Sequence, residues 1–274
     1  PLVSSSAASD VYKRQLYNKS MKLGPSEGLF STHKFEGTPS VNNPHPQKGF
    51  LYNGAKNPDL DRFFLSPSHY ALTLYAALIE TKRLNDKSLK EFNKDGSVLD
   101  MIGSEHSPGH ETNGGSFGQT ISQAAGVAWA RRRKKEKGLV WLFLSDGEFQ
   151  EGQTWEALMS MAFHKISNLK IVVDVNGQQV DGKTCDVMNL EPLLEKISSF
   201  GACVKQVDGH DLVALNNAFR TIHQDKPLVV LAKNSHFRGM EILEKRYPFL
   251  HYVRFKEENE KEEFKSFLND MKLR

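Results

Sequence analysis

Apolar and polar positions alternate along the chain in blocks that predict strands and helices in turn. Residues 139–144 form a short apolar run rich in β-branched and aromatic side chains, which indicates a buried strand. Residues 154–166 carry apolar side chains at helical spacing, and residues 171–173 predict a second buried strand. A strand, a helix and a strand within about 40 residues form a βαβ crossover, so we expect the two strands to be parallel. Their carboxyl ends then share one edge of the sheet, where open α/β sheets bind ligands.

The same alternation extends over most of the chain and predicts one α/β domain over residues 61–256. We expect a doubly wound, mostly parallel sheet with helices on both faces. The further strands are expected within 61–69 and at 202–207 and 227–232, and the further helices at 70–84, 120–135, 191–200 and 211–224.

The two ends of the chain differ from this domain. Residues 16–60 are rich in Pro, Gly and Asn, and they predict an irregular arm that follows the surface. Residues 257–274 predict a charged, solvated helix. Residues 1–15 resemble the in-frame translation of a sequencing-library adapter, so we expect them to be non-native and set them aside from the fold.

Composition and charge narrow the classes of function. Hydrophobic residues make up 39% and charged residues 25% of the 274, which is typical of a soluble globular protein. A net charge of +3 is too small for a nucleic-acid surface, and the basic run at 131–135 is expected to be a solvated helix end. The two cysteines, Cys185 and Cys203, lack metal or redox spacing and indicate a reducing, cytoplasmic location. No apolar run approaches the length of a membrane span, so no membrane partner is expected.

Polar side chains end both strands of the crossover. Asp146 follows the first strand and Asn176 follows the second, so a carboxylate and an amide oxygen are expected to meet at one edge of the sheet. These are hard oxygen donors that suit Mg²⁺ or Ca²⁺, and the backbone carbonyl of Gln178 is expected to join them. The alternative is that the Asp-Gly and Asn-Gly pairs are ordinary turn dipeptides. Their occurrence together on neighbouring strand ends favours the metal site.

The segment that holds these residues resembles the thiamine-diphosphate signature of transketolases. The matching stretches read DGEFQEG at 146–152, WEA at 155–157 and NLKIVVDVNGQQVDG at 168–182. Ser145 stands where the family usually has Gly, a change that removes some turn flexibility but no ligand. The resemblance implies a thiamine-diphosphate-binding fold.

The resemblance also implies roles for individual residues. The implied metal ligands are Asp146, Asn176 and the carbonyl of Gln178, and the implied cofactor contacts are His69, Gly115, Ser116, Phe117, Asp146, Gly147, Glu148, Asn176 and His251. His69 lies at a strand-to-helix junction, where it can donate to a phosphate or, alternatively, cap its own helix. The glycine-rich loop that contains Gly115 resembles the family loop that lets the backbone approach the cofactor rings.

Catalytic positions follow from the same resemblance. The family places a substrate-facing His ahead of its glycine-rich loop, and either His106 or His110 matches it. Glu151 matches a family glutamate in an acidic network across the dimer interface, although an acidic residue there is equally explained by the helix dipole. His251 matches the last His of a loop that closes over the diphosphate, and His236 is the alternative.

The resemblance covers about residues 60–252 and only one domain of a transketolase. It implies the N-terminal subunit of a split enzyme that transfers a two-carbon ketol unit from a ketose to an aldose, with a sugar or sugar-phosphate substrate. We expect an α2β2 assembly with a separate C-terminal subunit. One alternative is the α subunit of a 2-oxoacid dehydrogenase, against which the Gln-Glu-Gly and Trp-Glu-Ala stretches argue; another is a non-catalytic, cofactor-binding partner.

Overall fold

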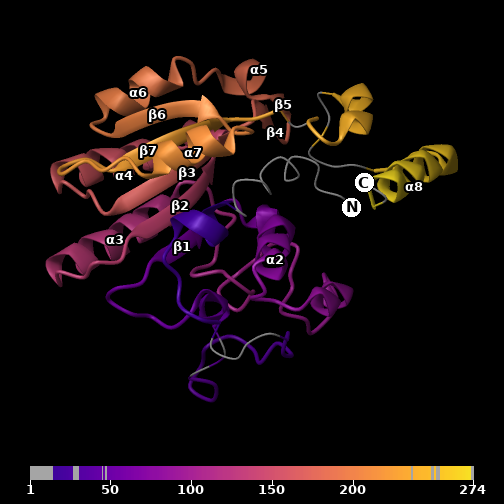
Figure 1. The fold of residues 1–274 in the computed structure, drawn as a ribbon, viewed down its shortest axis with the longest axis horizontal. Helices are drawn as coiled ribbons and strands as arrows, with labels where there is room; N and C mark the ends of the chain where they lie inside the picture. The colour runs from indigo at the N-terminus through magenta and orange to yellow at the C-terminus, as the bar shows by residue number, and fades with distance from the viewer. Residues whose placement is uncertain are drawn as a thin grey trace.

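Five parallel strands form the centre of the molecule. The computed structural model describes residues 15–26, 31–44, 46, 48–235, 237–247, 250 and 254–272. Every neighbouring pair of strands is parallel, so the predicted parallel sheet is confirmed. In the order in which they lie (Figure 1), the strands are β1 (Arg62–Leu65), β2 (Val140–Ser145), β3 (Leu169–Val175), β7 (Leu228–Lys233) and β6 (Cys203–Asp208).

The central strands are apolar along their whole length because both of their faces are covered. All of β2 is buried, and β3 is buried except at its last residue. The edge strand β6 is largely exposed and correspondingly more polar. Ser145 at the end of β2 pairs in register with Asp174 of β3, so the polar segments that follow these strands begin level with each other.

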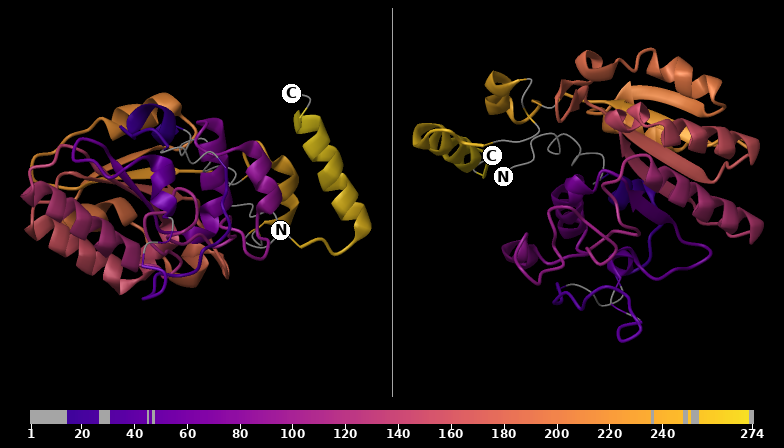
Figure 2. Two further views of the ribbon diagram at one scale, coloured as in Figure 1. Left: turned by 90° about the horizontal axis from the view of Figure 1, so that it is seen from below. Right: turned by 180° about the vertical axis from the view of Figure 1, so that it is seen from behind.

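Hydrophobic side chains alternate between two core layers, one on each face of the sheet. Phe63 and Trp141 belong to one layer, whereas the adjacent Phe64 and Leu142 belong to the other, as the period of two in a strand requires. The predicted helices on both faces are therefore confirmed (Figure 2). The first face is covered by α2 (Ala71–Glu80) and α7 (Leu212–Phe219), and the second by α3 (Gln119–Arg133), α4 (Gly152–Phe163) and α6 (Leu193–Ser199).

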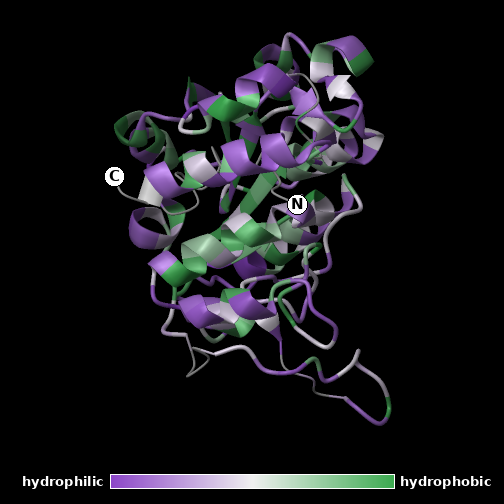
Figure 3. Ribbon diagram, turned by 90° about the vertical axis from the view of Figure 1, so that its right-hand side faces the viewer, coloured by the Kyte–Doolittle hydropathy of each residue, from purple (hydrophilic) through white to green (hydrophobic). Residues whose placement is uncertain are grey.

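Shorter elements connect this framework. Hydrophobic positions concentrate in the interior strands, whereas the outer helices carry mixed positions (Figure 3). A separate small cluster around Leu243 and Phe264 joins the last two helical elements. The shorter and terminal elements are η2 (Leu16–Ser20), η3 (Gly49–Asn53), η4 (Ser68–Tyr70), η5 (Asp86–Glu91), η6 (Asp146–Gln150), β4 (Gln178–Gln179), β5 (Gly182–Lys183), α5 (Thr184–Met188), η7 (Glu241–Arg246) and α8 (Glu258–Lys272).

The segment at 16–60 is less peripheral than its composition predicts. Leu16 and Tyr52 are fully buried and belong to the first core layer. The Tyr17 hydroxyl donates to Asn53 Oδ1 over 2.8 Å, and its ring meets Phe63 of β1 edge to face. Aromatic side chains thus draw both ends of the arm into the core, while its middle remains exposed. No helix in the described part of the chain is both long enough and apolar enough to cross a bilayer.

Candidate functional site

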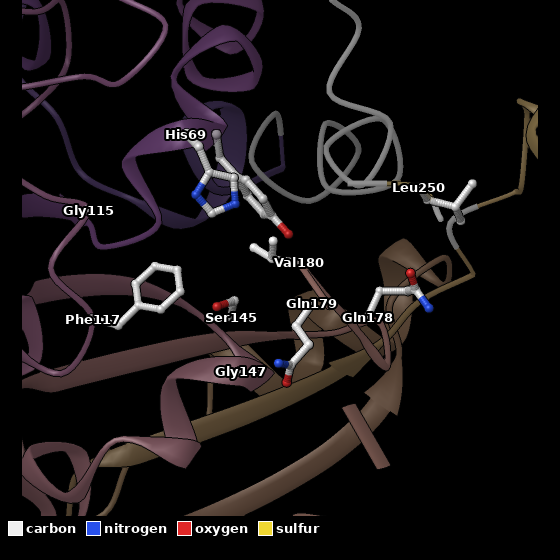
Figure 4. A pocket seen from close by; sticks show the side chains of 10 residues that line it. His69, Gly115, Phe117, Ser145, Gly147, Gln178, Gln179, Val180 and Leu250 are labelled. Carbon is white, nitrogen blue, oxygen red and sulfur yellow. The ribbon is translucent and has the colours of Figure 1, made fainter. Parts of the chain in front are cut away.

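A cavity of about 270 Å³ opens at the carboxyl edge of the sheet. It is bounded by the β1–α2 junction, the loop before α3, the β2–η6 turn and the short β4–β5 hairpin (Figure 4). The lining is mostly apolar with a few polar groups, which is typical of a small-molecule site. Its lining residues are His69, Tyr70, Gly115, Phe117, Ser145, Gly147, Gln178, Gln179, Val180 and Leu250.

Asp146 lies at the base of this cavity, in the turn that follows β2. Its carboxylate is 3% exposed and accepts the backbone N–H of Gly147 over 2.9 Å and that of Gly177 over 2.8 Å. The second hydrogen bond ties the β2 turn directly to the β3 turn. Burial, followed by the nearby carboxylate of Asp174, raises the pKa of Asp146 to about 7. A carboxylate in this environment is stabilised by a cation.

Asn176 approaches the same point from the end of β3. Its Oδ1 accepts the backbone N–H of Gln178 over 2.8 Å, while its Nδ2 donates to the Tyr70 hydroxyl and to Asp174. The structure therefore brings Asp146 and Asn176 together at the edge of the sheet. Expected turn chemistry is present as well, since the Asn176 side chain closes its own turn.

These groups fit a hard divalent cation. In the described ranges no group of three His, Cys, Asp or Glu residues is arranged to hold a metal, so a cage made only of such side chains does not occur there. One carboxylate, one amide oxygen and the carbonyl of Gln178 suit Mg²⁺, which keeps water or phosphate oxygens as its other ligands. Both polar atoms of the Gln178 side chain are buried and lack a hydrogen-bond partner, so this wall of the cavity retains unused polar groups.

His69 and the glycine-rich loop form the opposite wall. The His69 ring lies 6.1 Å from the Phe117 ring, measured between centroids. The loop is held to the β1–α2 junction because Gly115 N–H donates to Ser66 O over 3.2 Å. Gly115 has a φ of +92°, a conformation that favours glycine, and lines the cavity with its backbone. Ser116 is exposed and is not part of the lining.

Glu148 and Glu151 lie outside the cavity lining. Glu148 is fully buried, and it accepts the Ser66 hydroxyl over 2.6 Å and the Ser145 N–H over 3.2 Å. Burial raises its pKa to about 7, against the lowering effect of the Ser66 hydrogen bond. Because Ser66 follows β1, this carboxylate ties the β2–η6 turn to the β1 end. Glu151 is exposed at the start of α4, so its predicted role in an interface stays a prediction.

The candidate substrate-facing histidines are not in the cavity lining. His110 is 1% exposed and packs against the Tyr75 ring. His106 Nε2 lies 2.6 Å from Asp100 Oδ2, and its ring stacks on Phe35 in a separate hollow of about 210 Å³. The assignment of either one to the substrate stays a prediction. The other two candidates, His236 and His251, lie outside the described residues.

Sequence reasoning did not anticipate Tyr70 and Asp174. Tyr70 lines the cavity, and its hydroxyl donates to Asp174 Oδ2 over 3.1 Å. The only signal was the alternation along β3, which places Asp174 and Asn176 on the same side of the strand.

Comparisons with known proteins identify the family. Residues 50–236 match the family described as "Transketolase, thiamine diphosphate binding domain". The transketolase family protein y4mO of Sinorhizobium fredii, itself described as uncharacterized, is 42% identical over 190 residues, which cover 68% of each chain. One of the subunits of the apulose-4-phosphate transketolase of Actinobacillus succinogenes is 31% identical over 199 residues, which cover 72% of each chain.

Solved structures agree with this placement at the level of the fold. The transketolase from Leishmania mexicana superposes with a TM-score of 0.62 at 21% identity, over 84% of this chain. The match spans 35% of that transketolase, so the chain corresponds to about a third of the solved enzyme. The predicted thiamine-diphosphate-binding fold and its transketolase affiliation are both confirmed. This chain belongs to the transketolase family and carries its thiamine diphosphate-binding domain.

Proposed function

We propose that this chain is the N-terminal subunit of a transketolase that depends on thiamine diphosphate and Mg²⁺. It transfers a two-carbon ketol unit from a ketose to an aldose, acting on sugars or sugar phosphates in the cytoplasm together with a separate C-terminal subunit. The observation that carries this proposal is the meeting of Asp146 and Asn176 at one edge of the cavity, linked through the Gly177 N–H.

Each wall of the cavity contributes to holding the cofactor. Asp146, the Asn176 oxygen and the Gln178 carbonyl hold the metal ion, with Ca²⁺ as a substitute for Mg²⁺. His69 donates to the diphosphate at the opposite wall. These contacts fix the cofactor against substrate, which lowers the entropy that the reaction must lose. Bound thiamine diphosphate supplies the carbon nucleophile that attacks the ketose carbonyl.

The remaining predicted contacts complete this arrangement. Backbone groups of the glycine-rich loop and of the β2–η6 turn approach the cofactor rings and phosphates, and His106 or His110 orients the substrate after the partner subunit has bound. The predicted cofactor contacts in this group are Gly115, Ser116, Phe117, Gly147, Glu148 and His251.

A partner subunit is proposed on two grounds. The relative from Actinobacillus succinogenes is named as one subunit of a transketolase, and this chain corresponds to about a third of a solved transketolase. We therefore propose that a C-terminal subunit supplies the pyrimidine-binding half of the site, in an α2β2 assembly. Glu151, exposed beside the metal turn, is the proposed contribution of this chain to the acidic network between subunits.

Co-expression with a C-terminal transketolase subunit tests the proposed activity. We expect ketol transfer from a ketose to an aldose that requires both subunits, thiamine diphosphate and Mg²⁺. Turnover of pyruvate without ketose activity would instead assign the chain to a 2-oxoacid dehydrogenase. Cofactor binding without any turnover would make it a non-catalytic partner.

Replacement of Asp146 by Ala tests the metal site separately. Calorimetric titration of the chain with thiamine diphosphate should show Mg²⁺-dependent binding that Asp146→Ala abolishes, because the variant loses the only charged ligand. The circular dichroism spectrum should stay unchanged, since the residue lies at a sheet edge. An Asp208→Ala variant, altered at the exposed end of β6, should bind as the wild type does. Unaltered affinity in Asp146→Ala would refute the assignment.

A further inference from the structure

Asp174 lies at the centre of a buried hydrogen-bond network behind the cavity. The residue belongs to β3, between β2 and β7, and it is 1% exposed. Its Oδ2 accepts the Tyr70 hydroxyl and the Asn176 Nδ2 group, each over 3.1 Å, and its Oδ1 accepts the Asn234 Nδ2 group. The carboxylate therefore joins the β1–α2 junction, the end of β3 and the segment after β7.

This network determines which way the Asn176 amide faces. The Nδ2 group of Asn176 donates to Asp174 Oδ2 and to the Tyr70 oxygen, over 3.1 and 3.2 Å. A carboxylate only accepts hydrogen bonds, so a flipped amide would place its oxygen against the carboxylate oxygen. The flipped orientation is therefore disfavoured. In the observed orientation Oδ1 faces away from Asp174 and accepts the Gln178 N–H over 2.8 Å.

We propose that Asp174 is a positioning residue that fixes the Asn176 side chain so that its oxygen, and not its NH₂ group, faces the bound divalent cation. This inference rests on the proposed function, in which Asn176 is a metal ligand. Groups that orient a metal ligand without touching the metal strongly affect metal affinity. Tyr70 extends the same control to the cofactor, because it lines the cavity and bonds to both Asp174 and Asn176.

The Asp174→Asn variant tests the inference at constant side-chain size. The amide introduced at position 174 presents either an oxygen or an NH₂ group to Asn176, so the selection of one orientation is lost. We expect the Mg²⁺ concentration that half-saturates thiamine diphosphate binding to rise about 10-fold. Titration of the isolated chain with Mg²⁺ at fixed cofactor, followed by calorimetry, measures this concentration without any need for turnover. Asp208→Asn, the same change at the exposed end of β6, should leave it within about 2-fold.

A swap of the two side chains separates positioning from folding. Asn176→Asp alone places two carboxylates at the present amide–carboxylate contact and should weaken Mg²⁺ binding by about 10-fold or more. In the double variant Asp174→Asn, Asn176→Asp, the amide at 174 donates to a carboxylate at 176, which still offers an oxygen to the cation. We expect the double variant to bind Mg²⁺ within about 3-fold of the wild type.

Each outcome decides the matter. Wild-type half-saturation in a folded Asp174→Asn variant would overturn the inference, and so would a double variant whose loss equals the product of the two single losses. If Asp174→Asn unfolds, Tyr70→Phe gives the same test, since it removes one donor to Asp174; an unchanged Mg²⁺ requirement there would count against the inference. A wild-type chain that binds thiamine diphosphate without Mg²⁺ would overturn the proposed function as well, which distinguishes the two failures.

Discussion

The buried carboxylate of Asp146 should make the stability of the cofactor-free chain depend on pH, and the Asp146→Asn variant isolates that dependence. Asp146 is 3% exposed and accepts two backbone N–H groups, from Gly147 and Gly177. Burial, and then the Asp174 carboxylate, raises its pKa from an ordinary value of 3.8 to about 7. The amide variant has no proton to lose over this range and is otherwise similar in shape.

The sign and size follow from proton linkage. The folded state holds the Asp146 proton more tightly than the unfolded chain, so the free energy of unfolding falls as pH rises from about 4 to about 7 and levels off above. At about 1.36 kcal/mol per pKa unit, the whole fall amounts to about 4 kcal/mol. The part between pH 5 and pH 7 is about 2–3 kcal/mol. A weakened hydrogen bond in the variant costs about 1 kcal/mol, but that cost is the same at every pH.

Urea unfolding of the cofactor-free chain at pH 5 and pH 8 measures this difference. Between these two values the wild type should lose about 2–3 kcal/mol more stability than Asp146→Asn does. Glu148 also titrates near pH 7, but it is present in both proteins and cancels in the comparison. Asp208→Asn, at an exposed strand end, should follow the wild type. Equal pH dependence in the wild type and Asp146→Asn would refute the reasoning.

Three further changes test other parts of the site by the same urea titration. Glu148→Gln should flatten the fall in stability between about pH 4.5 and 7, because burial raises the pKa of this carboxyl to about 7; a wild-type slope would contradict this. Gln178→Leu should stabilise the cofactor-free chain by about 1–2 kcal/mol, because it removes two buried polar atoms without partners; a destabilised variant would mean that the amide has a partner. Gly103→Ala should destabilise by about 1–3 kcal/mol, because its Cβ would lie 2.1 Å from His110 Nε2, whereas Gly126→Ala, in open space on a helix, should not; equal effects would disprove the close contact.

The strand and helix positions were predictable because burial imposes a period on the sequence. The runs at 139–144 and 171–173 fall within β2 and β3, which are covered on both faces and therefore apolar throughout. The helix expected at 211–224 ends earlier, at Phe219, since the following segment is polar and leads into Pro227. The predicted tight turn at 145–147 is instead a 3₁₀ helix, which Ser145 and Glu148 stabilise through a reciprocal capping box.

The meeting of Asp146 and Asn176 was predictable from topology alone. Parallel strands joined by one crossover end at the same edge, so the residues that follow them must be neighbours whatever their rotamers. The positions of His106 and His110 were not predictable, because they lie in a long connection without periodic hydrophobic positions. There the packing of single residues decides: His110 is enclosed by Gly103 and Tyr75, and His106 turns away toward Asp100.

The role of Asp174 marks the boundary between these two kinds of prediction. Its position one strand residue short of the turn follows from the sheet, and the alternation of β3 puts it on the side of Asn176. Its partners Tyr70 and Asn234 are 104 and 60 residues away along the chain, and no local pattern pairs them with it. A buried carboxylate needs hydrogen-bond donors, so these partners had to exist, but only the folded arrangement determines which side chains they are. The orientation of a proposed metal ligand therefore depends on a contact that the sequence motif does not contain.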